Sequence, residues 1–303
     1  MNPQPLRAGL IRAAAALLVV VAFVVTSRLG NGPPVLLPLP SVAPDATVLL
    51  AVGDVASCDG TNDDDVAWLA AHLPGTIAIL GDVAYQDGSA SNFADCFDPA
   101  WAPMLSRIRP APGNHEYQTA DASAYFAEFG AVAGTPGEGW YSYELGGWHV
   151  IALNSNCEFV GGCEEGSPQL AWLQADLRAH PAICTLAYWH HPLHSSGLHE
   201  DEGAGLVDAL WRTLATAGAD VQLAGHDHDY ERVAPIDGIR SFVVGTGGRS
   251  LYPFDNPPGP QTEIRADDSY GLLMLTLHDT GYDWRFVPAI GSTLLDAGSG
   301  DCH

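Results

Sequence analysis

The chain has 303 residues, of which 47% are hydrophobic, a fraction typical of a globular protein rather than a disordered one. Its formal net charge is −24, and all 12 basic residues are arginine. Such an acidic chain excludes binding to a nucleic-acid backbone through clustered cations, and it also repels phosphate esters. A site that handles phosphate here would therefore need metal ions to supply positive charge.

Residues 1–30 have the pattern of a targeting segment. Arg7 and Arg12 precede an uncharged, mostly apolar run from Ala13 to Thr26, which is typical of a signal peptide or an N-terminal membrane anchor. The run is short for a spanning helix, which needs about 20 apolar residues. Residues 31–46 are rich in proline and predict a linker. We expect residues 47–303 to be exported, secreted or otherwise extracytoplasmic, and to contact a membrane only through an uncleaved N-terminal segment.

Six cysteines indicate an oxidising compartment and structural disulfides. Fifteen pairings are possible, and the sequence does not choose among them. The pairing that the spacing favours is Cys157 with Cys163, because Gly161 and Gly162 lie between them and allow so short a loop to close.

Short apolar strands alternate with helical patterns along the first part of this body. We expect strands at 48–52, 77–80 and 108–111, with helices at 63–73 and around 100–106. This alternation predicts a largely parallel sheet.

The rest of the chain adds a predicted hairpin and a run of further strands. Gly146 and Gly147 join apolar runs at 140–145 and 148–153, which is typical of a two-residue turn. The remaining elements are expected as a helix at 168–179, a strand at 183–189, a helix at 205–217, and strands at 221–224, 239–244, 271–278 and 282–287. We therefore predict an α/β fold in which two packed mixed β-sheets are flanked by helices, all within one domain.

Polar side chains follow five of the predicted strands. They are Asp54, Asp82 with Tyr85, Asn114 with His115, His190, and His226 with His228. In sheets of this class, ligands bind at the carboxyl ends of the strands. A single Gly-Asp after a strand is usually only a turn, but five such segments in this order indicate a shared site.

This combination resembles the calcineurin-like metallophosphoesterases and, within them, the purple acid phosphatases. The segments that carry the resemblance are Gly53-Asp54-Val55-Ala56, Gly81-Asp82-Val83-Ala84-Tyr85, Gly113-Asn114-His115-Glu116, His190-His191-Pro192 and Gly225-His226-Asp227-His228. Many members of the wider superfamily have Asp-x-His at the first motif, whereas Ala56 stands in place of that histidine here. Tyr85 after the second motif is the feature that looks like the purple acid subgroup. The resemblance implies that residues 47–303 are the catalytic domain.

The resemblance also implies a pair of metal ions. Asp54, Asp82, Tyr85 and His228 would hold the first ion. Asp82 would bridge to the second ion. Asn114, His190 and His226 would complete the ligand set of that ion. Carboxylate and phenolate oxygens suit Fe(III) at the Tyr85 site, and imidazole with an amide oxygen suits Zn, Fe(II) or Mn at the other.

Several histidines compete for roles in this scheme. His190 and His191 compete for one ligand position, and the family's His-x-Pro pattern selects His190. His115 would lie beside the bound phosphate, and His199 would donate a proton to the leaving group, with His194 as its rival. Glu231 and Arg232 follow the last motif, where an ion pair that supports the loop is expected rather than contact with the substrate.

The function that the resemblance implies is hydrolysis of small-molecule phosphate monoesters by in-line attack of a metal-bound hydroxide, as in an acid phosphatase. A phosphodiesterase with the same metals is the alternative, because the metal pair does not itself distinguish the two esters. The loops at 86–99, 117–139 and 155–166 are expected to form the pocket walls that do. A non-catalytic metal-binding protein is the alternative from another functional class.

Overall fold

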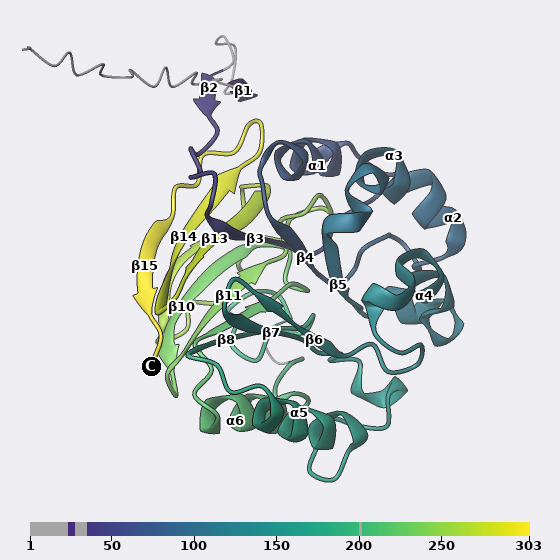
Figure 1. The fold of residues 1–303 in the computed structure, drawn as a ribbon. Helices are drawn as coiled ribbons and strands as arrows, with labels where there is room; N and C mark the ends of the chain where they lie inside the picture. The colour runs from purple at the N-terminus through teal and green to yellow at the C-terminus, as the bar shows by residue number, and fades with distance from the viewer. Residues whose placement is uncertain (1–23, 28–34, 200–201) are drawn as a thin grey trace, which may run out of the picture.

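The computed structural model describes residues 24–27, 35–199 and 202–303 (Figure 1). The predicted targeting segment therefore lies mostly outside the described residues, and so does the start of the predicted linker. A short antiparallel pair, β1 (Val24–Ser27) with β2 (Val35–Pro38), precedes the main body, so the predicted linker includes one strand. Among the residues that are described, no helix combines the length and the apolar character that a membrane crossing requires.

Two β-sheets packed face to face form the centre of the molecule, as predicted (Figure 1). From edge to edge, the six-stranded sheet contains β15 (Ala297–Asp301), β14 (Gly281–Pro288), β13 (Gly271–His278), β3 (Thr47–Val52), β4 (Thr76–Leu80) and β5 (Ile108–Ala111). The seven-stranded sheet contains β12 (Thr262–Ala266), β10 (Tyr230–Ile236), β11 (Ile239–Val244), β9 (Val221–Ala224), β8 (Cys184–Tyr188), β7 (Trp148–Ala152) and β6 (Tyr141–Leu145).

The strands that carry the predicted site motifs run parallel to one another within each sheet. In one sheet β3, β4 and β5 are parallel, and in the other β7, β8, β9 and β11 are parallel. The remaining pairings, which involve β6, β10, β12, β13, β14 and β15, are antiparallel, so the prediction of a largely parallel sheet holds only for part of each sheet. Gly146 and Gly147 both have positive φ, 60° and 89°, and they close the predicted β6–β7 hairpin.

Alternation along each strand divides the core into two parts. Leu49 and Ala51 of β3 belong to the cluster between the sheets, together with Leu223 of β9. Val48 and Leu50 of the same strand belong instead to the cluster beneath the helices. This is the period of two that a strand buried on both faces requires.

Helices cover the outer faces of both sheets (Figure 1). They are α1 (Asn62–His72), α2 (Ala90–Asn92), α3 (Asp98–Trp101), α4 (Ser123–Phe129), α5 (Pro168–Ala179) and α6 (Asp208–Thr216). One π-helical turn, η1 (Phe93–Phe97), and five 3₁₀ turns, η2 (Ala102–Arg107), η3 (Glu116–Gln118), η4 (Ala120–Ala122), η5 (Gly130–Ala133) and η6 (Cys157–Phe159), connect them. The helix predicted around 100–106 is in fact α3 followed by η2, with a proline in each segment. Helix α5 begins as predicted, since Ser167 Oγ accepts from Leu170 N.

Three disulfides pair all six cysteines. Cys157 is bonded to Cys163, which confirms the favoured pairing. The other two bonds are Cys58–Cys96 and Cys184–Cys302. Three intact disulfides fit an extracytoplasmic location.

Candidate metal centre

The carboxyl ends of five strands meet at one edge of the two sheets and bring the predicted polar residues together. Asp54 follows β3, Asp82 and Tyr85 follow β4, Asn114 follows β5, His190 follows β8, and His226 and His228 follow β9. Backbone hydrogen bonds join neighbouring loops within each sheet. Asp54 N donates to Gly81 O at 3.1 Å, and Gly225 N donates to His190 O at the same distance.

Three of these residues have left-handed backbone conformations. The φ angles of Asp54, Asp82 and His226 are 59°, 48° and 72°. Residues other than glycine rarely adopt this region, and those that do tend to cluster at functional sites because the surrounding structure must hold them there. Close approach also explains the glycines of two motifs. A Cβ at Gly113 would lie 2.1 Å from Asp82 Oδ1, and one at Gly225 would lie 2.6 Å from Asp54 Oδ2.

The first group of donor atoms surrounds the buried Tyr85 hydroxyl. It lies 2.9 Å from Asp54 Oδ1, 2.9 Å from Asp82 Oδ2 and 3.1 Å from His228 Nε2. His228 Nδ1 donates to Ser250 O at 2.7 Å, which leaves the Nε2 lone pair directed at the cluster. Burial and the two carboxylates raise the pKa of Tyr85 well above its ordinary value.

The second group of donor atoms surrounds His190 Nε2. It lies 2.9 Å from Asn114 Oδ1, 3.2 Å from His226 Nδ1 and 3.3 Å from Asp82 Oδ1. The other ring nitrogen, His190 Nδ1, donates to Leu80 O at 2.8 Å, so Nε2 is again the atom that faces the cluster.

Asp82 lies between the two groups. Its Oδ2 faces the Tyr85 group and its Oδ1 faces the His190 group, and the residue is fully buried. Burial by itself would raise the pKa of this carboxyl, but His190 and His115 outweigh that effect and hold it far below its usual range. Burial by itself would lower the pKa of His190, because it also disfavours the charged form of an imidazole, but Asp82 raises this pKa to about 9.

The donor set fits a pair of cations. The Tyr85 hydroxyl has one hydrogen and faces two carboxylate oxygens and one imidazole nitrogen. These buried lone pairs outnumber the hydrogens available to them, and a buried acceptor without a partner costs about 1–3 kcal/mol. Three of the four donors around Tyr85 are oxygens, whereas nitrogen supplies two of the four around His190, so the second group is the richer in nitrogen, as expected from the sequence.

The structure places the competing histidines in different surroundings. His191 Nδ1 lies 2.7 Å from Ser155 Oγ, but the residue also offers a ligand atom within 4.8 Å of ligand atoms of His190 and His226, so it adjoins the second donor group. The ring of His194 packs edge-on against Trp211 at 4.7 Å, while the ring of His199 lies 4.8 Å from that of His226. His115 lies at the edge of the centre, with Nε2 3.7 Å from Asp82 Oδ2.

Two buried or bridging carboxylates near the centre had no role in the sequence analysis. Glu116 accepts from Gly113 N at 2.7 Å and Val83 N at 2.9 Å, and it thereby ties together the loops that carry Asn114 and Asp82. Its place directly after the Gly-Asn-His segment was a signal that could have identified it. Glu202 contacts His226 Nε2 at 2.8 Å and His199 Nδ1 at 2.9 Å, and no local pattern marks it.

A cation at the edge of the centre was also missed. The guanidinium of Arg249 lies 5.0 Å from the centre of the Tyr85 ring, and Arg249 N donates to Asp54 O at 3.0 Å. Arg249 follows the glycine-rich end of β11, so it repeats the strand-end signal that marked the other loops.

Arg232 forms ion pairs, as expected after the last motif, but Glu231 is not its partner. Successive residues of a strand point to opposite faces, and both residues lie in β10. Arg232 pairs with Asp296 and Glu263, whereas Glu231 accepts from Ser196 N at 2.7 Å.

Comparison with known proteins agrees with this geometry. A family model described as calcineurin-like phosphoesterase matches residues 47–230. Human acid phosphatase type 7 is 30% identical over 208 residues, which cover 60% of this chain and 45% of that protein. Purple acid phosphatase 22 of Arabidopsis thaliana is 29% identical over 247 residues, which cover 70% of this chain and 55% of that protein. The chain thus spans about half the length of these curated relatives.

A solved structure confirms the predicted fold class. The purple acid phosphatase from yellow lupin (Lupinus luteus) seeds matches with a TM-score of 0.71 at 18% identity. The match covers 90% of this chain and 58% of that chain. At this identity the likeness concerns the fold alone.

Proposed function

The chain belongs to the calcineurin-like phosphoesterase family, and on that premise we propose that it is an exported phosphatase that hydrolyses phosphate monoesters at a binuclear metal centre. The curated relatives that are named acid phosphatases support the type of ester. The three disulfides support export, because such bonds persist in oxidising compartments.

One observation carries the proposal: the two oxygens of Asp82 face two different groups of donor atoms. A carboxylate in this position is suited to bridge two cations. Asp54, Tyr85 and His228 would complete the first set of ligands, and Asn114, His190 and His226 would complete the second. We assign Fe(III) to the Tyr85 set and Zn, Fe(II) or Mn to the His190 set. When bound there, two such ions would supply positive charge near the phosphoryl group and would make water more acidic.

The flanking histidines would handle the ester itself. His115 follows the ligand Asn114 and stands 3.7 Å from Asp82, where its ring can donate to a phosphoryl oxygen. His199 lies on the other side, against the His226 ring, with its Nδ1 held by Glu202. That contact leaves Nε2 to deliver a proton to the departing alkoxide, a step that typically contributes 10²–10⁴-fold to the rate.

Replacement of Asp82 by Asn tests the proposal. We expect the variant to lose both metals, measured by elemental analysis, and to lose turnover of an aryl monophosphate. Asp279→Asn makes the same chemical change at an exposed carboxyl and should alter neither property. An active Asp82→Asn variant would contradict the bridging role.

The choice of substrate in the same assay separates the alternatives. Faster cleavage of a bis-aryl phosphodiester than of the monoester would identify a phosphodiesterase. A metal-loaded wild-type protein that is inert toward both esters between pH 4 and 8 would identify a non-catalytic metal-binding protein.

A further inference from the structure

A pocket of about 400 Å³ opens beside the candidate metal centre. We call it the ester pocket. Its lining includes Asn114, Tyr117, Glu158, Phe159, His191 and Leu206. Two of the three loops predicted to form pocket walls, 117–139 and 155–166, contribute residues to it. A pocket of this size lies within the range that small organic ligands occupy.

The ester pocket is continuous with the second group of donor atoms. Asn114, which lines it, has its Oδ1 2.9 Å from His190 Nε2. His191 lines it as well, and its ring lies 4.4 Å from that of His226. A phosphate ester whose phosphoryl group lies at the metal centre can therefore extend its organic group into this space.

An aromatic pair forms one wall of the ester pocket. The rings of Tyr117 and Phe159 stack with centroids 4.5 Å apart and planes inclined by 16°. Tyr117 is buried, but Phe159 is 51% exposed, one of few large hydrophobic side chains in the described residues with so much free surface. A half-exposed ring at the edge of a pocket offers a stacking surface to a planar ligand.

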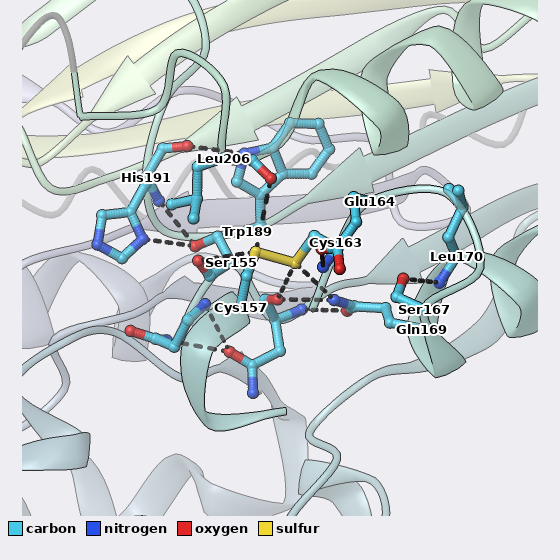
Figure 2. Close-up of a disulfide and its surroundings, with 12 residues drawn as sticks. Ser155, Cys157, Cys163, Glu164, Ser167, Gln169, Leu170, Trp189, His191 and Leu206 are labelled. Atoms are coloured by element: carbon cyan, nitrogen blue, oxygen red, sulfur yellow. Dashed lines mark hydrogen bonds between the residues drawn. A yellow bond between two sulfur atoms is a disulfide. The ribbon is translucent and has the colours of Figure 1, made fainter. Parts of the chain in front are cut away.

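Buried polar contacts and a disulfide fix this wall in place. Asn154 Nδ2 donates to the Tyr117 hydroxyl at 2.7 Å. The side chain of Gln169 in α5 holds the Asn154 backbone, since Asn154 N donates to Gln169 Oε1 at 2.7 Å and Gln169 Nε2 donates to Asn154 O at 2.8 Å. Figure 2 shows that the Cys157–Cys163 bond lies between Ser155 and His191 on one side and Gln169 on the other. Phe159 stands inside the short loop that this disulfide closes. The aromatic wall is therefore preorganised, which lowers the entropic cost of binding.

The charge of the lining limits what the ester pocket can accept. Glu158 contributes a carboxylate, and the lining within the described part of the chain includes neither lysine nor arginine. An organic group with its own negative charge would meet repulsion from Glu158, with no arginine or lysine of the lining to offset it.

We infer that the ester pocket binds the organic group of the substrate and selects monoesters of planar, aromatic alcohols that carry no second anionic group. This inference rests on the proposed function, since it places the phosphoryl group at the metal centre. Phe159 stacks on the aromatic ring, and Glu158 excludes anionic substituents.

Binding of phosphonates, which are not hydrolysed, tests the ester pocket without reference to turnover. The probes are phenylphosphonate, methylphosphonate and 4-carboxyphenylphosphonate, titrated calorimetrically into the metal-loaded full chain. We expect phenylphosphonate to bind about 10-fold more tightly than methylphosphonate, and Phe159→Ala to remove most of that ratio. Leu295→Ala, which removes a 77% exposed side chain outside the pocket, should leave the ratio unchanged. Glu158→Gln should tighten binding of the carboxyphenyl probe and not of the phenyl probe.

Equal affinity for the phenyl and methyl probes, or a ratio that survives Phe159→Ala, would overturn the inference. Failure of the proposed function gives a different result. The protein would then show the Phe159-dependent preference in binding and yet hydrolyse no aryl monophosphate.

Discussion

Glu202 offers a sharp test of how the candidate active site is held together. Its two carboxylate oxygens contact two histidines with different proposed roles: Oε2 lies 2.8 Å from Nε2 of the ligand His226, and Oε1 lies 2.9 Å from Nδ1 of the proton donor His199. Burial would raise the pKa of Glu202, but its hydrogen bonds to both histidines hold it below the ordinary value. We predict that Glu202→Ala weakens metal retention through His226 and misorients His199.

The size of the effect follows from the exposure of the side chain. Hydrogen bonds to a charged group contribute about 1.5–3 kcal/mol each when they are shielded from water. The side chain of Glu202 is 53% exposed, so solvent screening reduces each contact to about 1 kcal/mol. Two contacts give about 2 kcal/mol, which corresponds to a loss of about 30-fold in kcat/KM. Glu202→Gln keeps one acceptor oxygen and should lose only about 5-fold.

Kinetics and metal analysis together assign the loss to one histidine or the other. We would measure kcat and KM for an aryl monophosphate at saturating metal, and metal content after dialysis, with Glu165→Gln as an exposed control. If Glu202 positions His199, the double variant Glu202→Ala/His199→Ala should be no slower than His199→Ala alone at saturating metal. A Glu202→Ala protein within 2-fold of wild type in both kcat/KM and metal retention would refute the assignment.

Three further predictions concern the metal, the fold and pH. Tyr85→Phe should abolish a visible tyrosinate-to-iron charge-transfer band in the absorption spectrum; a colourless, active wild-type protein filled with zinc would contradict the iron assignment. The Cys184→Ala/Cys302→Ala variant opens a loop of 118 residues and should lose about 5 kcal/mol of unfolding free energy, measured by urea denaturation. Loss of the Cys157–Cys163 disulfide beside the ester pocket should cost only about 2 kcal/mol. A larger loss for the second disulfide than for the first would contradict this account. Burial, with a smaller contribution from a neighbouring aspartate, raises the pKa of Asp63 from 3.8 to about 7, so the native state should lose stability between about pH 4 and 7 as this group ionises. Asp63→Asn lacks the titrating group, so its unfolding free energy should not show this loss. Compared with wild type, its unfolding free energy should rise by on the order of 1 kcal/mol between pH 4 and pH 8. Parallel curves of stability against pH for the two proteins would show that Asp63 does not titrate in this way.

The strand-end motifs could be predicted from the sequence because their signal is local. A buried strand ends in glycine and a polar residue follows, as at Gly53-Asp54 and Gly81-Asp82. Parallel packing then brings such ends to one edge of the sheets, so the neighbourhood follows once the strands are identified. The Cys157–Cys163 bond is local in the same sense.

Features that depend on contacts between distant segments could not be predicted. Strand β15 contains Gly298 and Gly300, and a sequence so rich in glycine does not resemble a strand; it is formed by pairing with β14. Glu202 reaches His226 across 24 residues, and Tyr117 meets Phe159 across 42. No periodicity in the sequence encodes such pairs.

The two parts of the site also differ in how firmly the fold specifies them. The donor groups stand on strand ends whose backbone is fixed by inter-loop hydrogen bonds and by residues such as Asp82 in strained conformations. The ester pocket has its walls on loops that a disulfide, side-chain contacts and short-range backbone hydrogen bonds hold, with Phe159 free on one side. Changes at Phe159 or Glu158 can therefore alter which ester binds without disturbing the donor geometry. Loss of Asp82, by contrast, would remove the bridge on which both donor groups depend, whatever ester the pocket selects.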